Sequence, residues 1–128
     1  MQHIYYFDGN REKISWVIKN ENKTYQEIRI HPKYYFNKLS VEQSKYVALH
    51  VGIFWGIGRF IIKNMDELSI KTDLKSINEN FVKNKTSNDP FLKARIIHIK
   101  HLINQRSLRI QYQIIDIKEN LANKLLTL

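Results

Sequence analysis

The sequence predicts an α/β domain built on one five-stranded mixed sheet with helices on both faces. Two observations lead to this prediction. The chain begins with three short segments of alternating apolar and polar residues joined by tight turns, a pattern typical of an antiparallel meander. It continues with strand-like and helical segments in alternation, which is typical of crossovers that add parallel strands. A length of 128 residues with 43% hydrophobic residues fits a single domain over residues 1–128.

The three meander strands are expected at residues 2–7, 13–19 and 24–30. The first is rich in aromatic residues and ends at Asp8-Gly9-Asn10, a combination of residues that favours a turn. The second and third alternate regularly, and Asn20-Glu21-Asn22 between them is typical of a tight turn.

A long helix is expected from Ser40, a good N-cap residue, to about residue 63. Its section 47–62 is strongly apolar, but it is shorter than a membrane span and carries His50 and Arg59. We therefore expect a core helix there and no association with a membrane. The later elements are expected as a strand at 67–71, a helix at 74–82, a helix at 91–104 opened by Pro90, a strand at 107–115 and a helix at 119–126.

The net charge of +9 indicates an anionic partner, and nucleic acid is the commonest one. The alternative is a proteome rich in lysine and asparagine, in which many proteins are basic. The chain has no cysteine, which excludes disulfides and thiolate metal sites. The first residues lack the basic and apolar regions of a signal peptide, so a cytoplasmic location is expected.

Four short motifs stand at the boundaries of these elements. Asp8-Gly9 follows the first strand, and Thr72-Asp73 follows the fourth. Residues 44–53 (SKYVALHVGI) lie in the long helix, and residues 122–126 (ANKLL) lie in the last. In this order, the motifs resemble those of the ribonuclease H family, particularly its short bacterial and archaeal type. The resemblance covers essentially the whole chain and implies the ribonuclease H fold.

The resemblance also implies a chemistry. The family hydrolyses the RNA of RNA–DNA hybrids with two divalent metal ions, Mg²⁺ or Mn²⁺, held by four carboxylates. Two of these are matched by Asp8 and Asp73, which would be the catalytic and metal-binding residues of an active enzyme. The family's glutamate aligns with Lys45 and its last aspartate with Asn123, a neutral and weaker ligand. A lysine would oppose metal binding, so the resemblance predicts a degraded site.

Two other acids are candidates to replace the missing carboxylates. Glu42 lies one helical turn before Lys45 and would reach the metals if the helix were shifted along its axis. The alternative is that Glu42 is a first-turn acid favoured by the helix dipole. Asp116, which follows the last strand, is the second candidate, and a solvated loop acid is its alternative.

A basic segment runs from the end of the expected helix at 74–82 into the last strand. In the family, this region includes a helix that grips the DNA strand, and such phosphate contacts add affinity with little sequence information. The alternative is a solubilising helix face. The candidate nucleic-acid-binding residues are Lys83, Lys85, Lys93, Arg95, Lys100 and Arg106.

Three functions remain open from the sequence. The chain is a nucleic-acid-binding domain with weak or no nuclease activity, an active endonuclease on RNA–DNA hybrids, or a non-catalytic protein-interaction domain that acts as a monomer or dimer. The position of Lys45 distinguishes the first two. If Lys45 points into the cleft, its ammonium can pair with Asp8 or Asp73 in place of a metal. If it points to solvent and Glu42 faces the aspartates, catalysis is favoured.

Overall fold

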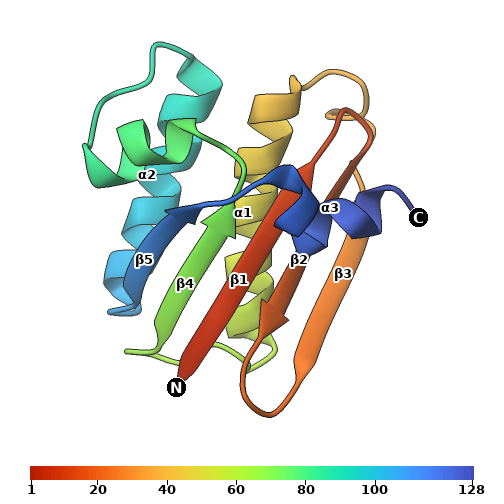
Figure 1. Cartoon of the computed structure of the whole chain (residues 1–128). Helices are drawn as coiled ribbons and strands as arrows, with labels where there is room; N and C mark the ends of the chain where they lie inside the picture. Colours follow the sequence, from red (N-terminus) through yellow and green to blue (C-terminus); the bar gives the residue numbers. More distant parts are fainter.

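The computed structural model describes residues 1–128 and confirms the mixed sheet. The strands run in the order β3-β2-β1-β4-β5 (Figure 1). The meander strands pair antiparallel, and β4 and β5 are added parallel to β1. The strand bounds are β1 Gln2–Gly9, β2 Lys13–Lys19, β3 Thr24–Ile30, β4 Glu67–Thr72 and β5 Arg109–Ile114.

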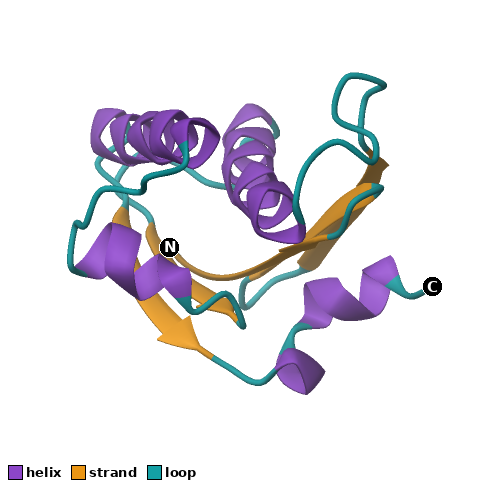
Figure 2. Ribbon diagram, turned by 90° about the horizontal axis from the view of Figure 1, so that it is seen from above, coloured by secondary structure: helices purple, strands orange, loops and turns teal.

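Helices cover both faces of the sheet, as expected. Figure 2 shows two long helices on one side and the short C-terminal helix on the other. The long ones are α1 (Val41–Gly58) and α2 (Pro90–Gln105), and the short one is α3 (Leu121–Leu126). Two single turns complete the chain, a π-helical turn η1 (Asn78–Val82) after β4 and a 3₁₀ turn η2 (Ile117–Glu119) before α3.

The core lies between the sheet and the two long helices. Successive side chains of a strand point to opposite faces, so Tyr5 and Phe7 of β1 face α1, while Tyr6 faces α3. The larger cluster includes Trp16 and Ile70, and all four of its residues named here are almost fully buried. The smaller cluster packs Tyr6 and Val17 against Ala122 and Leu125 of α3. Because apolar side chains alternate in this way along the strands, both faces of the sheet are apolar and both are covered by helices.

The predicted end of one helix and the predicted extent of another were wrong. The helix expected to reach residue 63 ends at Gly58, because Arg59 caps it and Phe60 takes a left-handed conformation with φ 61°. The helix expected at 74–82 is shorter than predicted, and it ends in the π-helical turn η1. Within this turn, buried Asn80 donates a hydrogen bond to the Tyr46 hydroxyl across 2.7 Å. The beginning of α1 is as predicted: Ser40 and Gln43 form a capping box. No helix combines the length and the apolar character that crossing a membrane requires.

Candidate functional site

Two aspartates lie at the carboxyl ends of neighbouring parallel strands. Asp8 is the penultimate residue of β1 and is 2% exposed, and Asp73 directly follows β4. Because β1 and β4 pair in parallel, these two ends meet at the same edge of the sheet. The main-chain N–H of Gly9 donates to Asp8 Oδ1 across 2.8 Å, which fixes one oxygen of that carboxylate.

A close contact between β1 and α1 determines which helix residue faces these aspartates. A Cβ atom placed on Gly9 would lie 2.6 Å from Ser44 Oγ and 2.8 Å from the Ser44 carbonyl carbon. Glycine is therefore required for the two backbones to approach so closely. Ser44 is fully buried and is held by His31, whose Nε2 lies 2.6 Å from its hydroxyl. This fixes the rotation of α1 and directs the next residue, Lys45, to the strand ends.

The ammonium group of Lys45 lies between the two carboxylates. Its Nζ is 3.0 Å from Asp73 Oδ2 and 3.6 Å from Asp8 Oδ1. The Lys45 and Asp73 side chains are 15% and 14% exposed, so the interaction is only partly screened by water. Burial alone would raise the pKa of Asp73, but hydrogen bonds from Asn120 and Lys45 and the charge of Lys45 lower it below its usual value.

Two asparagines from the last part of the chain complete the site. Asn123 donates from Nδ2 to Asp8 Oδ2 across 2.8 Å. Asn120 donates from Nδ2 to Asp73 Oδ1 across 2.7 Å and to the main-chain oxygen of Phe7 across 3.1 Å. The Asn120 side chain also accepts a hydrogen bond from Ala122 N and so caps α3. Asn120 is fully buried and had not been singled out from the sequence, where its N-cap position was the only signal.

The two candidate replacement acids lie outside this contact network. Glu42 is exposed in the first turn of α1 and makes no hydrogen bond or ion pair with Asp8 or Asp73. Asp116 is also exposed and caps the turn η2 by accepting from the main-chain N–H of Lys118 across 2.9 Å. The site therefore brings together Asp8, Asp73, Lys45 and Asn123, and it leaves out Glu42.

The donor set of this site does not fit a pair of divalent cations. A metal ion bridging Asp8 and Asp73 would have to displace the Lys45 ammonium from the same carboxylate oxygens. Both asparagines turn amide N–H groups, not oxygens, toward the carboxylates. No group of three or more His, Cys, Asp or Glu side chains in the molecule could hold a metal ion. Hard divalent cations need several oxygen ligands, and only two carboxylates are present here.

Comparison with known proteins finds similarity in structure alone. No protein-family model and no curated protein sequence matches the chain. Among solved structures, ribonuclease H1 of Halobacterium salinarum superimposes with a TM-score of 0.78 at 14% identity, over 98% of this chain and 94% of that one. The N-terminal ribonuclease H domain of Mycobacterium tuberculosis Rv2228c gives 0.78 at 13% identity, over 98% and 95%.

A third structure, LC11 ribonuclease H1 in complex with an RNA/DNA hybrid, gives a TM-score of 0.70 at 19% identity, over 96% of this chain and 92% of that one. These matches extend over nearly the whole of both chains. The chain has the ribonuclease H fold. The fold implied by the sequence motifs is thus confirmed.

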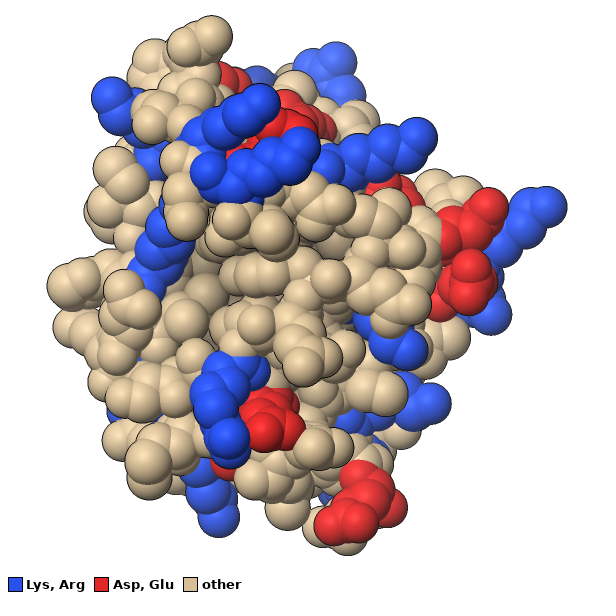
Figure 3. All heavy atoms as spheres, turned by 60° about the vertical axis from the view of Figure 1, so that its left-hand side comes forward, with Lys and Arg blue, Asp and Glu red and all other residues tan.

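The predicted basic residues of this ribonuclease H fold divide into two groups. Lys83 and Lys85 both pair with Glu79, across 3.2 and 2.9 Å, and Lys100 donates to Asn84 across 2.9 Å. These three lysines, which we call the η1 lysines, form one basic cluster where η1 and its following loop meet α2. Figure 3 shows Lys and Arg side chains gathered around acidic ones at the upper end of this side of the molecule.

The other predicted basic residues lie in three different surroundings. Arg95 is half-buried between the long helices, where it donates to His50 Nδ1 and to the Tyr35 hydroxyl. Arg106 caps the C-terminal end of α2, about 24 Å along the helix from its start. Lys93 is exposed in the first turn of α2.

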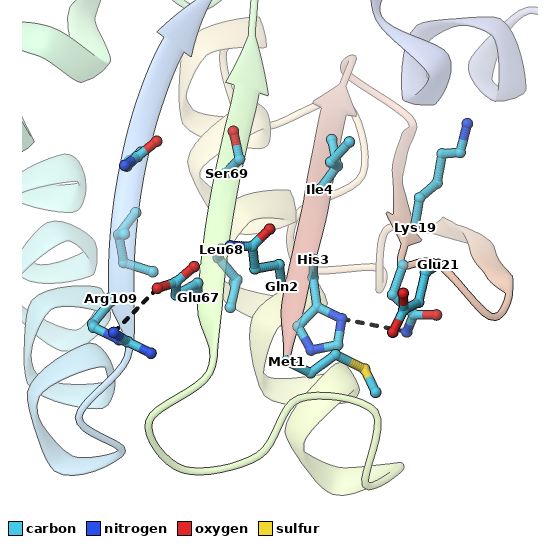
Figure 4. A pocket seen from close by; sticks show the side chains of 13 residues that line it. Met1, Gln2, His3, Ile4, Lys19, Glu21, Glu67, Leu68, Ser69 and Arg109 are labelled. Carbon is cyan, nitrogen blue, oxygen red and sulfur yellow. Dashed lines mark hydrogen bonds and ion pairs between the residues drawn. The ribbon is translucent and has the colours of Figure 1, made fainter.

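One cavity of the molecule contains none of these residues. It has a volume of about 900 Å³ and lies over the amino-terminal parts of β1, β4 and β5 (Figure 4). Gln2, Ile4 and Ser69 line its floor, and an ion pair of 3.1 Å joins Arg109 to Glu67 at one side. The strand ends that carry Asp8 and Asp73 lie at the opposite end of the sheet. We place the functional site at those strand ends because its charged groups are buried and converge.

Proposed function

We propose that this chain is a ribonuclease-H-fold module that binds nucleic acid and has weak or no nuclease activity. The observation that carries the proposal is the position of Lys45. Its ammonium contacts both aspartates at distances of 3.0 and 3.6 Å, in the place where a bridging cation would bind. The positive charge of Lys45 thus compensates part of the negative charge of the two carboxylates.

The charge of the site supports binding without metal ions. The formal charges of Asp8, Asp73 and Lys45 add up to −1. Four carboxylates in the same space would repel the phosphates of a nucleic acid strongly unless divalent cations were bound. With Lys45 and Asn123 in place of two acids, a phosphate can approach this edge of the sheet at much lower electrostatic cost. We therefore expect binding that does not require Mg²⁺.

Two further observations support nucleic acid as the partner. The net charge of +9 favours a polyanion, and the η1 lysines provide one surface on which phosphates can bind. One structural neighbour, LC11 ribonuclease H1, has been captured with an RNA/DNA hybrid. A duplex, and an RNA–DNA hybrid in particular, is accordingly the ligand to test first. A cytoplasmic location remains a prediction.

The alternative is an active endonuclease with Mg²⁺ or Mn²⁺ held by Asp8 and Asp73. This function requires Lys45 to leave its two partners, and Glu42 with Asn123, or Asp116, to complete the ligand set. The contacts described above oppose it, because Glu42 and Asp116 are exposed and make no contact with the aspartates. The second alternative, a protein-interaction domain, would bind nucleic acid only weakly or not at all.

An assay with a labelled RNA–DNA hybrid separates these functions. Binding and cleavage are measured in EDTA, in Mg²⁺ and in Mn²⁺, with Asp73→Asn as the matched variant. The proposal predicts salt-sensitive binding that persists in EDTA and is not strengthened by Mg²⁺ or Mn²⁺, with little or no cleavage in any condition. Efficient cleavage that Asp73→Asn abolishes would establish the endonuclease. The absence of both binding and cleavage would favour the protein-interaction domain.

A further inference from the structure

One edge of the sheet is open along a complete strand. Strand β3 has only one neighbour, β2, and its outer side is covered by no other strand (Figure 1). The pairing with β2 is continuous from Thr24–Lys19 to Ile30–Lys13, without a bulge. The strand contains no proline. The strand therefore lacks both a β-bulge and a proline, two features that protect edge strands of natural proteins from pairing with another chain.

The hydrogen bonds to β2 determine which backbone groups face outward. His31 N donates to Glu12 O across 2.8 Å, and Asn20 N donates to Lys23 O across 3.0 Å. Antiparallel pairs alternate, so the odd-numbered residues of β3 are bonded to β2. The even-numbered residues Gln26, Ile28 and Ile30 then direct their N–H and C=O groups away from the sheet.

The side chains of β3 are complementary to a second copy of the same strand. Glu27 and Arg29 share the face of the sheet that α1 covers, where the Arg29 guanidinium lies 5.2 Å from the centre of the Trp16 ring. Ile28 and Ile30 lie on the opposite face and are 40% and 68% exposed. In an antiparallel pair centred on Ile28, Glu27 of each copy lies directly opposite Arg29 of the other.

We propose that β3 is a self-association edge, through which two copies of this chain join their sheets about a two-fold axis at Ile28. Ile28 exchanges main-chain hydrogen bonds with Ile28 of the second copy, and Gln26 exchanges them with Ile30. Glu27 and Arg29 of one strand already pair across 3.4 Å, and in the dimer each also faces the opposite charge of the second copy, while the exposed isoleucines become covered on the other face. The interface is isologous, as two-fold symmetry requires. It is also small, so the association is weak and depends on concentration.

The charges of the strand select this register over its neighbours. Centring the pair on Glu27 places that carboxylate opposite its own copy. Centring it on Gln26 places Lys23 beside Arg29 of the second copy. Like charges directly opposite each other are destabilising, so both arrangements are disfavoured. The register at Ile28 brings opposite charges together and still pairs most of the strand.

Sedimentation equilibrium over a range of concentrations tests the proposal with charge variants. The wild-type chain is expected to move from monomer to dimer as its concentration rises to hundreds of micromolar. Glu27→Arg and Arg29→Glu each place like charges opposite one another, so each is expected to weaken the dimer about tenfold or more. An equimolar mixture of the two variants restores both ion pairs, and so does the double variant E27R/R29E. Both are expected to associate as the wild type does.

Amide hydrogen exchange gives a second measurement on the wild-type chain that needs no variant. Exchange at Gln26, Ile28 and Ile30 is expected to slow as the concentration rises, while amides of β5, the other edge strand, provide the internal control. A wild-type chain that stays monomeric at every concentration would overturn the proposal. So would single variants that dimerise as well as the wild type, or a mixture that does not regain the association.

Discussion

Lys45 donates a hydrogen bond to Asp73 across 3.0 Å and so connects the second turn of α1 with the end of β4. The same ammonium is 3.6 Å from Asp8 at the end of β1. A single side chain therefore connects the three elements that converge at this edge of the sheet. We therefore expect Lys45 to stabilise the fold as well as to offset part of the negative charge of the site.

Replacing Lys45 by Met should lower the free energy of unfolding by about 2 kcal/mol, because two poorly hydrated carboxylates would lose their shared cation. Denaturant unfolding measures this loss. Lys75→Met is the control, since Lys75 is exposed two residues after Asp73 and should change stability by less than about 0.5 kcal/mol. Equal stabilities of Lys45→Met and the wild type would mean that the ammonium contributes nothing to folding.

Stability should fall at acidic pH through Asp73. Although burial raises the pKa of this carboxyl group, hydrogen bonds from Asn120 and Lys45 lower it below its usual 3.8 in the folded chain. Its contribution is therefore complete above about pH 4 and is lost as the pH falls through the lower folded value. Unfolding of the wild type and of Asp73→Asn should be compared between pH 6 and pH 2.

The difference in unfolding free energy between the two proteins should shrink as the pH falls below about 4. Asp66, whose pKa is also lowered, contributes equally to both proteins and cancels in this comparison. A difference that stays constant down to pH 2 would show that the pKa of Asp73 is not lowered by folding.

The double variant K45E/N123D should gain divalent-metal-dependent cleavage of an RNA–DNA hybrid, because it restores both acids that the family resemblance places there. Gel analysis of a labelled hybrid in Mn²⁺ measures the gain in cleavage. The control is K45Q/N123D, which removes the lysine but places a neutral glutamine, and no carboxylate, at position 45. If the double variant folds and binds Mn²⁺ but leaves the hybrid intact, some other part of the molecule prevents catalysis.

Neutralising the η1 lysines by K83Q/K85Q/K100Q should weaken hybrid binding about tenfold or more and make the salt dependence of the affinity less steep. Fluorescence anisotropy at several salt concentrations measures both quantities. The matched control is K19Q/K63Q/R106Q, which removes the same charge from the end of β2, from the loop between α1 and β4, and from the end of α2. An equal loss of hybrid affinity in the two triple variants would indicate that binding depends on the net charge of the chain and not on a defined basic surface.

Local patterns were sufficient to predict most of the fold. The alternating segments at residues 13–19 and 24–30 correspond to the observed bounds of β2 and β3, because strand periodicity and turn residues act over a few positions. The end of α1 was not predictable in this way. It depends on the left-handed conformation of Phe60, which the apolar sequence after Gly58 does not reveal.

The site was only partly predictable for a related reason. Asp8 and Asp73 follow strands whose parallel pairing could be inferred, so their proximity was expected. The choice between Lys45 and Glu42 depends on the position of α1 along its own axis, which the tertiary contact between Gly9 and Ser44 determines. Asn120 was missed because its partners, Asp73 and Phe7, lie 47 and 113 residues away in the chain.

Direct titration of the wild-type chain with Mn²⁺, followed by calorimetry or by electron paramagnetic resonance, tests whether Lys45 takes the place of a divalent cation. We expect no stoichiometric binding of Mn²⁺ to the wild-type chain at millimolar Mn²⁺, and binding by K45E/N123D under the same conditions. Stoichiometric binding by the wild-type chain that Asp73→Asn abolishes would show that Lys45 does not exclude a metal ion from the site.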